Sequence, residues 1–205
     1  MPNPRPMTRV ERAAQRLLDV HGITKAPVPV ELIARAEMIT VAFEDLGRDD
    51  VSGMLYRKSG TSVIIVNDRH HHHRQRFTIA HEIGHADLHD SDTYLDGLAS
   101  LRFRDERSAT GTDTEEREAN GFAAALLMPE QWVRRDFMRL VTGRQIIAED
   151  SVVTRLAKEF DVSEQAMRLR LVNLNLIDPA LQIESRLKIG KYRHANGAKR
   201  PGAHT

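Results

Sequence analysis

Apolar residues recur at three- and four-residue steps near the start of the chain, a spacing that predicts two amphipathic helices. The first is expected over residues 8–21 and should end near His21-Gly22, because glycine commonly follows the last residue of a helix. The second is expected over residues 29–37. The apolar faces consist of Val10, Ala13, Ala14, Leu17 and Leu18 in the first helix, and of Leu32, Ile33 and Ala36 in the second.

The pattern then changes to short runs of β-branched and other apolar residues, which favour strands. Residues 39–43 form one run, and residues 53–56 and 62–67 form two more on either side of Lys58-Ser59-Gly60-Thr61. A short connection with glycine between two such runs is typical of a β-hairpin. If the outer strand of this hairpin is a sheet edge, a peptide can add to it as a further strand. Polar residues then predominate over 68–75, which predicts a loop.

The next helical pattern contains His81-Glu82-Ile83-Gly84-His85. Residues four apart lie on one face of a helix, so the two imidazoles can share one metal ion. Glu82 then lies beside a metal-bound water, where a zinc hydrolase needs a base. The competing interpretation is an unrelated amphipathic helix with two surface histidines. Glycine in a helix interior costs about 1 kcal/mol relative to alanine. Its presence at position 84 suggests that another segment approaches the helix closely there.

A metal site of this type needs a third ligand, and the chain has no cysteine to supply one. Zinc hydrolases with two histidines use a glutamate and leave one position open for water. Residues 114–129 begin with glutamates, as suits a helix N-terminus, and then become apolar. Glu116 is the preferred ligand because Asn120, one turn later, can orient a ligating side chain. Glu118 lies on the opposite side of the helix and is the second choice, and Glu115 is the third.

Several other side chains near the motif are weaker candidates. His89 follows His85 by four residues, so direct ligation is an alternative to packing or hydrogen bonding. His89 and Tyr94 are also candidates for stabilising an oxyanion. The four histidines at 70–73 are expected to form a solvated loop, although such a tract can bind Ni²⁺ or Zn²⁺ adventitiously.

Residues 149–177 have the pattern of two short helices with a turn at Asp161-Val162. Ser163 is a suitable N-cap for the second helix. The pair resembles a helix-turn-helix, in which Arg168 and Arg170 would lie near DNA phosphates. Acidic residues in the same segment favour packing against the rest of the chain or against a protein partner over direct DNA binding.

Composition narrows the class of protein. The chain has 205 residues, 40% of them hydrophobic, which suffices for one domain with an appendage or for two small domains. The absence of cysteine excludes disulfides and thiolate ligands, and neither a secretory signal nor a membrane-length apolar run is recognisable. These features predict a cytoplasmic protein. The net charge is only +1, but residues 185–205 are basic with no acidic residue and are expected to form a disordered tail.

Five segments have an informative order and spacing. They are PVPVELIA at 27–34, IIVN at 64–67, RQRFTIAHEIGH at 74–85, EREANGFAAALLMP at 116–129 and LAKEFDVSEQAM at 156–167. Together they resemble the ImmA/IrrE family of zinc metallopeptidases, over about residues 10–178.

The resemblance implies an α+β fold, namely a zincin-like metallopeptidase with a small antiparallel sheet and a metal-binding helix. The peptidase domain is expected at residues 1–148, the helix-turn-helix-like segment at 149–180, and the basic tail after it. The chain is expected to depart from the larger family members, because its length leaves no room for a sizeable C-terminal sensor domain. It also carries an acidic, polar insertion between His89 and Glu115.

The resemblance also implies a function. His81, His85 and Glu116 would bind Zn²⁺, and Glu82 would be the catalytic acid and base. The substrate would be a helix-turn-helix transcriptional repressor, whose cleavage relieves repression of a mobile element or of a stress response. The alternative is a non-proteolytic, metal-stabilised regulator that binds DNA or a partner through residues 149–177. Glu82 favours the enzyme, since a structural zinc site closes its fourth position and needs no base.

Overall fold

The structure is a computed structural model that describes residues 6–47, 49–58, 60–89, 93–94, 109–142 and 149–178. The basic tail expected at 185–205 lies outside these residues, as does most of the insertion after His89. The described helices are α1 (Arg9–Val20), α2 (Val30–Ala36), α3 (His72–Leu88), α4 (Ala109–Leu127), α5 (Glu130–Val141), α6 (Glu149–Phe160) and α7 (Glu164–Asn173). The described strands are β1 (Ile39–Glu44), β2 (Gly53–Lys58), β3 (Thr61–Asn67) and β4 (Thr93–Tyr94).

The α+β class is confirmed, and the four described strands form one sheet in the order β1-β3-β2-β4. β2 and β3 pair antiparallel, with Leu55 opposite Ile64, so the expected hairpin is present. β1 runs parallel to β3, with Val41 opposite Ile64, so the expected small antiparallel sheet was wrong for this one pair. The physical reason is that the chain reverses direction between β1 and β2 and again between β2 and β3. β3 therefore runs in the same direction as β1 and pairs with it in parallel.

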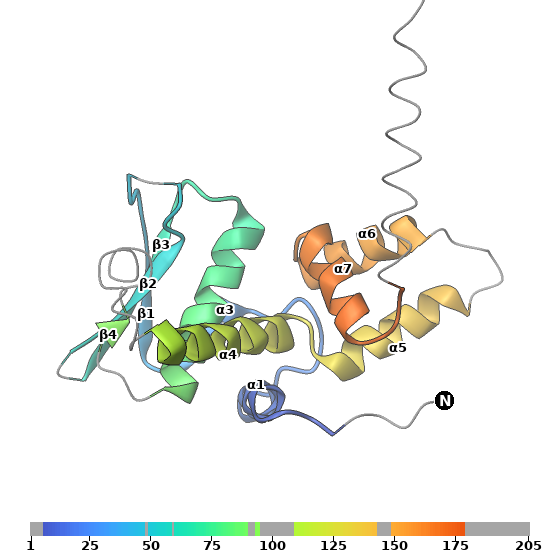
Figure 1. Ribbon diagram of the computed structural model, residues 1–205, viewed down its shortest axis with the longest axis horizontal. Helices are drawn as coiled ribbons and strands as arrows, with labels where there is room; N and C mark the ends of the chain where they lie inside the picture. Colours follow the sequence, from blue (N-terminus) through green and yellow to red (C-terminus); the bar gives the residue numbers. More distant parts are fainter. Residues whose placement is uncertain are drawn as a thin grey trace, which may run out of the picture.

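The hydrophobic core is one continuous cluster that extends from α1 to α7. It contains Leu17 of α1, Ile64 of β3, Ile83 of α3, Phe122 of α4 and Phe160 of α6, all of them buried. Figure 1 shows the sheet on one side of α3 and the group α5–α7 on the other. The same core thus spans the expected boundary between 148 and 149, and the division into a peptidase domain and a helical segment stays a prediction.

The two predicted N-terminal helices are confirmed within a residue or two. α1 begins with a capping box, in which Thr8 Oγ1 accepts from the Glu11 N–H at 3.2 Å and Glu11 Oε2 accepts from the Thr8 N–H at 3.0 Å. Its face of Leu17 and Leu18 is buried, while Val20 is 67% exposed. No described helix is both long and apolar enough to cross a membrane.

α3 and α4 cross closely at Gly84. A Cβ atom built on Gly84 would lie 3.0 Å from Phe122 Cδ1 and 3.2 Å from Phe122 Cβ. Phe122 is fully buried, and its Cβ is fixed to the α4 backbone, so the contact cannot be relieved by a simple rotation of the ring. The close approach that the sequence suggested at Gly84 is confirmed, and it brings the metal-binding helix against α4.

Two glycine-to-alanine substitutions should therefore change the free energy of unfolding in opposite directions. Gly121→Ala in α4 is expected to stabilise the fold by up to about 1 kcal/mol, because its Cβ would meet only Val10 Cγ1 at 3.5 Å. Gly84→Ala has the same gain in helix propensity but an overpacking cost of about 1–3 kcal/mol. Urea denaturation of both variants measures the free energies of unfolding. Equal effects of the two substitutions would contradict the close α3–α4 crossing.

The N-terminal end of α3 is tied to the turn between α6 and α7. Nε2 of His72 lies 2.8 Å from Asp161 Oδ2, Nε2 of His73 lies 3.3 Å from Asp161 Oδ1, and Arg76 Nε donates to the Asp161 carbonyl at 3.1 Å. Burial alone would raise the pKa of the Asp161 carboxyl, but the His72 hydrogen bond and the charge of Arg76 lower it below its ordinary value. The expected loop over 68–75 was thus wrong in its second half, because these contacts with Asp161 hold His72 and His73 in the first turn of α3.

The two helices expected within 149–177 are present as α6 and α7. Ser163 is the N-cap of α7, and its Oγ accepts from the Ala166 N–H at 3.1 Å. Asp161, in the turn between the helices, has φ 54°, a left-handed conformation that few residues other than glycine adopt. The buried residues Val153, Leu156 and Met167 join the pair to the common core.

Both arginines of α7 make contacts within the chain. Arg168 donates to Glu149 at 2.7 Å and also pairs with Asp150. Arg170 is buried, and its Nε donates to the Met128 carbonyl at 3.0 Å. The two guanidinium groups therefore hold α7 against α6 and the end of α4, and these contacts favour the packing interpretation over contact with DNA phosphates.

Candidate metal centre

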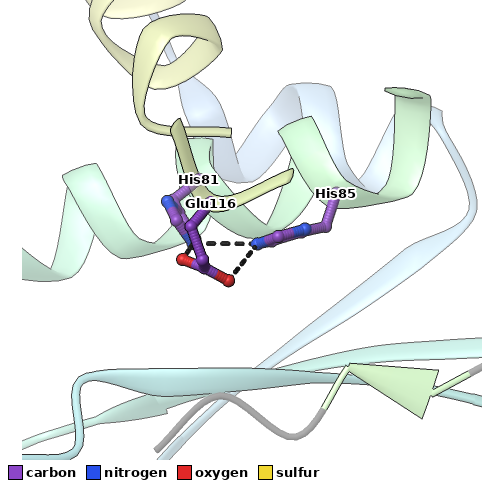
Figure 2. Close-up of side chains that lie close together, drawn as sticks. All are labelled: His81, His85 and Glu116. Atoms are coloured by element: carbon purple, nitrogen blue, oxygen red, sulfur yellow. Dashed lines mark hydrogen bonds and ion pairs between the residues drawn. The ribbon is translucent and has the colours of Figure 1, made fainter. Parts of the chain in front are cut away.

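Two crossing helices bring three potential metal ligands together. His81 and His85 project from one face of α3, and Glu116 projects toward them from α4 (Figure 2). The two Nε2 atoms are 3.0 Å apart. Glu116 Oε2 lies 3.3 Å from His81 Nε2, and Glu116 Oε1 lies 3.2 Å from His85 Nε2.

These separations fit a common metal ion. Bonds of about 2.0–2.1 Å to nitrogen and oxygen place the ligand atoms of a tetrahedral site about 3.3 Å apart. The three measured separations, 3.0, 3.2 and 3.3 Å, are close to that value. Of the three glutamates considered from the sequence, Glu116 is the one that the structure brings to the two rings. The residues present therefore suit a metal with two imidazole ligands and one carboxylate ligand.

The charge state of Glu116 suits a ligand. Its side chain is about one-third exposed, whereas that of His85 is fully buried. Partial burial would raise the pKa of Glu116, but hydrogen bonds and charge interactions with His81 and His85 lower it well below its ordinary value. At neutral pH the group is therefore a carboxylate, which is the form that binds a metal ion.

Asn120 orients the His81 ring, as its position one turn after Glu116 led us to expect. Its Oδ1 lies 3.2 Å from His81 Nδ1. An amide oxygen can only accept, so His81 Nδ1 carries the proton and Nε2 presents its lone pair toward His85 and Glu116. This hydrogen bond fixes the tautomer that metal binding requires.

A longer series of hydrogen bonds orients His85. Glu118 Oε2 lies 3.1 Å from His89 Nε2, and His89 Nδ1 lies 3.2 Å from His85 Nδ1. A carboxylate can only accept, so His89 Nε2 donates to Glu118. In a neutral His89 the Nδ1 atom is then an acceptor, so His85 Nδ1 donates and His85 Nε2 keeps its lone pair. His89 is thus not one of the three converging ligands. Its two ring nitrogens contact His85 and Glu118, which does not favour the alternative role of stabilising an oxyanion.

Breaking this series should weaken metal binding without removing a ligand. His89→Ala and Glu118→Ala are each expected to lower the affinity for zinc by about 10- to 100-fold, the usual effect of losing a group that orients a ligand. Competition with a chromophoric chelator measures the affinity. Glu115→Ala is the matched control on the same turn of α4 and should leave the affinity unchanged. A wild-type affinity in both test variants would show that the His85 ring is oriented without them.

Glu82 lies on α3 between the two histidines in sequence and is only 1% exposed. Tyr94 belongs to β4, and its backbone pairs with that of Leu55, but its side chain lies outside the described part of the structure. The expected role of Tyr94 at an oxyanion stays a prediction. Glu82 follows His81 directly in α3, and its expected role as the base stays a prediction as well.

A family model for the IrrE N-terminal-like domain, Peptidase_M78, matches residues 34–172. The chain belongs to this metallopeptidase family. The matched range includes α3 with both histidines, α4 with Glu116, α6, and α7 except its last residue. Membership of the family implies a metal, in agreement with the geometry of the histidine and glutamate group.

Individual relatives agree with the family. The chain is 28% identical over 160 residues to "Uncharacterized immunity region protein 2" of Bacillus phage phi105, which covers 78% of the chain and 93% of that protein. It is 36% identical over 102 residues to "Radiation response metalloprotease IrrE" of Deinococcus radiodurans, which covers 50% of the chain but 28% of that protein. A solved structure, "Mycobacterium tuberculosis transcriptional regulator", has a TM-score of 0.52 at 19% identity, covers 79% of the chain and 46% of that protein, and supports the fold alone.

Local sequence reasoning missed one residue of the centre. Arg9 of α1 places its Nη1 3.4 Å from Glu118 Oε1, and its Nη2 donates to the Leu88 carbonyl at 3.1 Å. Arg9 is separated from Glu118 by 109 residues, and no periodic pattern links two positions so far apart. The arginine holds Glu118 beside the last turn of α3, where the series of hydrogen bonds to His85 begins.

Proposed function

We propose that the chain is a zinc-dependent endopeptidase that hydrolyses a peptide bond in a helix-turn-helix transcriptional repressor and so relieves repression. The observation that supports this most directly is the convergence of His81 Nε2, His85 Nε2 and the Glu116 carboxylate, within 3.0–3.3 Å of one another. The two histidines lie on α3, the helix that also carries Glu82, and Glu116 reaches them from α4. Zinc is the metal for which two imidazoles, a carboxylate and an open position form a hydrolytic site. The names of the two relatives, an immunity region protein and a radiation response metalloprotease, agree with a regulatory role.

His81, His85 and Glu116 would hold the zinc, which would supply Lewis acidity toward the scissile carbonyl and would lower the pKa of a bound water to about 7. Glu82 accepts a proton from the attacking water as general base and then donates it to the leaving amine as general acid. His81 and His85 each present a lone pair at Nε2, because each donates its ring hydrogen from Nδ1. His81 donates to Asn120, and His85 donates to His89. The negative charge of Glu116 balances part of the charge of the cation and leaves it electrophilic.

A repressor substrate also fits the placement of the remaining parts. The activity would take place in the cytoplasm, where transcriptional repressors act. The α6–α7 pair is packed against α3 through Asp161 and against α4 through Arg170, so we assign it to support of the peptidase or to contact with the repressor. The non-proteolytic regulator that binds DNA through this pair is less well supported, because Arg168 and Arg170 already bind groups of the chain.

The test is incubation of the purified, zinc-loaded chain with the repressor that is encoded beside its gene. We expect a cut in the repressor, located by mass spectrometry of the intact products, and loss of the cut when a chelator is added. Restoring zinc should restore cleavage. An uncut repressor in the presence of chain that contains one zinc per molecule would contradict the proposal, as would a cut that persists in chelator.

A further inference from the structure

A pocket of about 390 Å³ lies between α3, the C-terminal end of α4 and the turn that precedes α7. Its wall is mainly apolar and includes Phe77, Leu127, Met128, Val162 and Ala166. A volume of this size is within the range of pockets that bind small ligands or side chains. None of the roles assigned to the metal centre involves this pocket.

The pocket adjoins the metal centre along one ridge of α3. His73, Phe77, His81 and His85 follow one another at four-residue steps, so their side chains lie in line on the helix surface. The first two line the pocket, and the other two are the histidines of the metal centre. The ring centroids of Phe77 and His81 are 6.4 Å apart. The pocket thus begins one helical turn before the first histidine of the centre.

The spacing along this ridge can be compared with that of a peptide. Four residues of helix rise by about 6 Å, and an extended peptide advances about 3.3 Å per residue. A metal shared by His81 and His85 would lie between them, about 9 Å along the helix from Phe77. A substrate that runs along the ridge in an extended conformation therefore reaches the pocket about three residues from the bond that faces the metal.

We propose that this pocket binds an apolar side chain of the polypeptide substrate, about three residues from the scissile bond, and thereby determines where the substrate is cut. The inference rests on the proposed function. It adds to the proposed reaction a preference for certain substrate sequences. An aliphatic or aromatic side chain fits the pocket because its wall includes Phe77, Leu127 and Val162.

The charges at the rim of the pocket indicate which substrate residue is preferred next to that apolar side chain. Arg74 lines the pocket, and its guanidinium donates to the neutral Ser52 Oγ at 2.8 and 3.1 Å. Its charge is not offset by that contact. No acidic residue is among the described residues that line the pocket, and Asp161, which lies beside His73, is already shared with His72 and Arg76. The substrate preference is therefore for an apolar residue next to an acidic one.

Filling the pocket tests the proposal. Ala166→Trp places a large ring in the wall, whereas Gln131→Trp places the same ring at a separate pocket lined by α1, α5 and α7 residues and is the matched control. The assay uses the zinc-loaded full chain and a library of internally quenched peptides that are derived from the cleaved repressor and vary at one position each. We expect Ala166→Trp to lose the preference for an apolar residue at the fixed position and to lower kcat/KM by about 10- to 200-fold, mainly through KM. Zinc content and the melting temperature should stay at their wild-type values.

A charge reversal gives an independent readout if Ala166→Trp does not fold. Arg74 is exposed, so Arg74→Glu is expected to fold and to change the favoured neighbour of the apolar residue from acidic to basic. A wild-type chain that cuts the repressor, together with variants that keep the wild-type preference at every position, would overturn the pocket proposal alone. A wild-type chain that cuts neither the repressor nor any peptide would overturn the proposed function, and the pocket with it.

Discussion

Glu82→Gln is expected to lower kcat for repressor cleavage by about 10²–10⁴-fold while the chain keeps its metal. Glutamine has nearly the shape of glutamate, so the packing of this buried side chain on α3 is preserved. It cannot accept a proton from water, however, and cannot return one to the leaving amine. The measurement is single-turnover cleavage of the repressor by chain with one zinc per molecule, with zinc content determined on the same sample.

The control for Glu82→Gln is Glu115→Gln, which makes the same chemical change on α4 at a glutamate outside the ligand group. Cleavage by this control should equal that of the wild type. If Glu82→Gln cleaved the repressor at the wild-type rate, Glu82 would have no role in proton transfer. If it lost both zinc and activity, the residue would be a structural member of the site, and the proposed chemistry would need another base.

Glu116→Ala is expected to weaken zinc binding by more than about 100-fold, a larger loss than any orienting group causes. The substitution removes the carboxylate whose oxygens lie 3.2–3.3 Å from the two Nε2 atoms. Two imidazoles alone leave two positions of the metal to water and remove the negative charge that offsets the cation. Because zinc stabilises only the form that binds it, the zinc-dependent rise in melting temperature should also disappear.

The comparison across three glutamates makes this prediction specific. Chelator competition should rank the losses of zinc affinity as Glu116→Ala first, Glu118→Ala second and Glu115→Ala last, with the last close to zero. A larger loss for Glu118→Ala than for Glu116→Ala would identify Glu118 as the ligand. In that case α4 would have to rotate relative to α3 when the metal binds.

The spacing of apolar residues was sufficient to predict several helices, because a helix with one buried face has apolar residues at three- and four-residue steps. The apolar faces of residues 8–21 and 149–160 required no long-range information, and both helices are present. No helix was predicted over residues 130–141, although Trp132, Val133 and Phe137 have helical spacing and Pro129 is the N-cap of α5. The parallel pairing of β1 with β3 was not predicted for a different reason, since no local pattern indicates that β3 lies between β1 and β2.

The ligands of the metal centre could be predicted because each group of them lies within a single helix. The four-residue step from His81 to His85 and the shared face of Glu116 and Asn120 follow from helix geometry alone, and the structure brings all four together. The contact of Arg9 with Glu118 joins elements that are remote in sequence, so no pattern could indicate it. The same is true of the apolar pocket, whose wall combines α3, α4 and α7.

The location of the bound metal tests the account most directly. A crystal of the zinc-loaded chain, measured with X-rays above the zinc absorption edge, gives an anomalous difference map in which zinc is the strongest feature. The account predicts one peak about 2.0–2.1 Å from His81 Nε2, His85 Nε2 and an oxygen of Glu116, with a fourth position that no protein atom fills. A strongest peak at the histidines of 70–73, or a peak whose fourth ligand is a protein side chain, would contradict it.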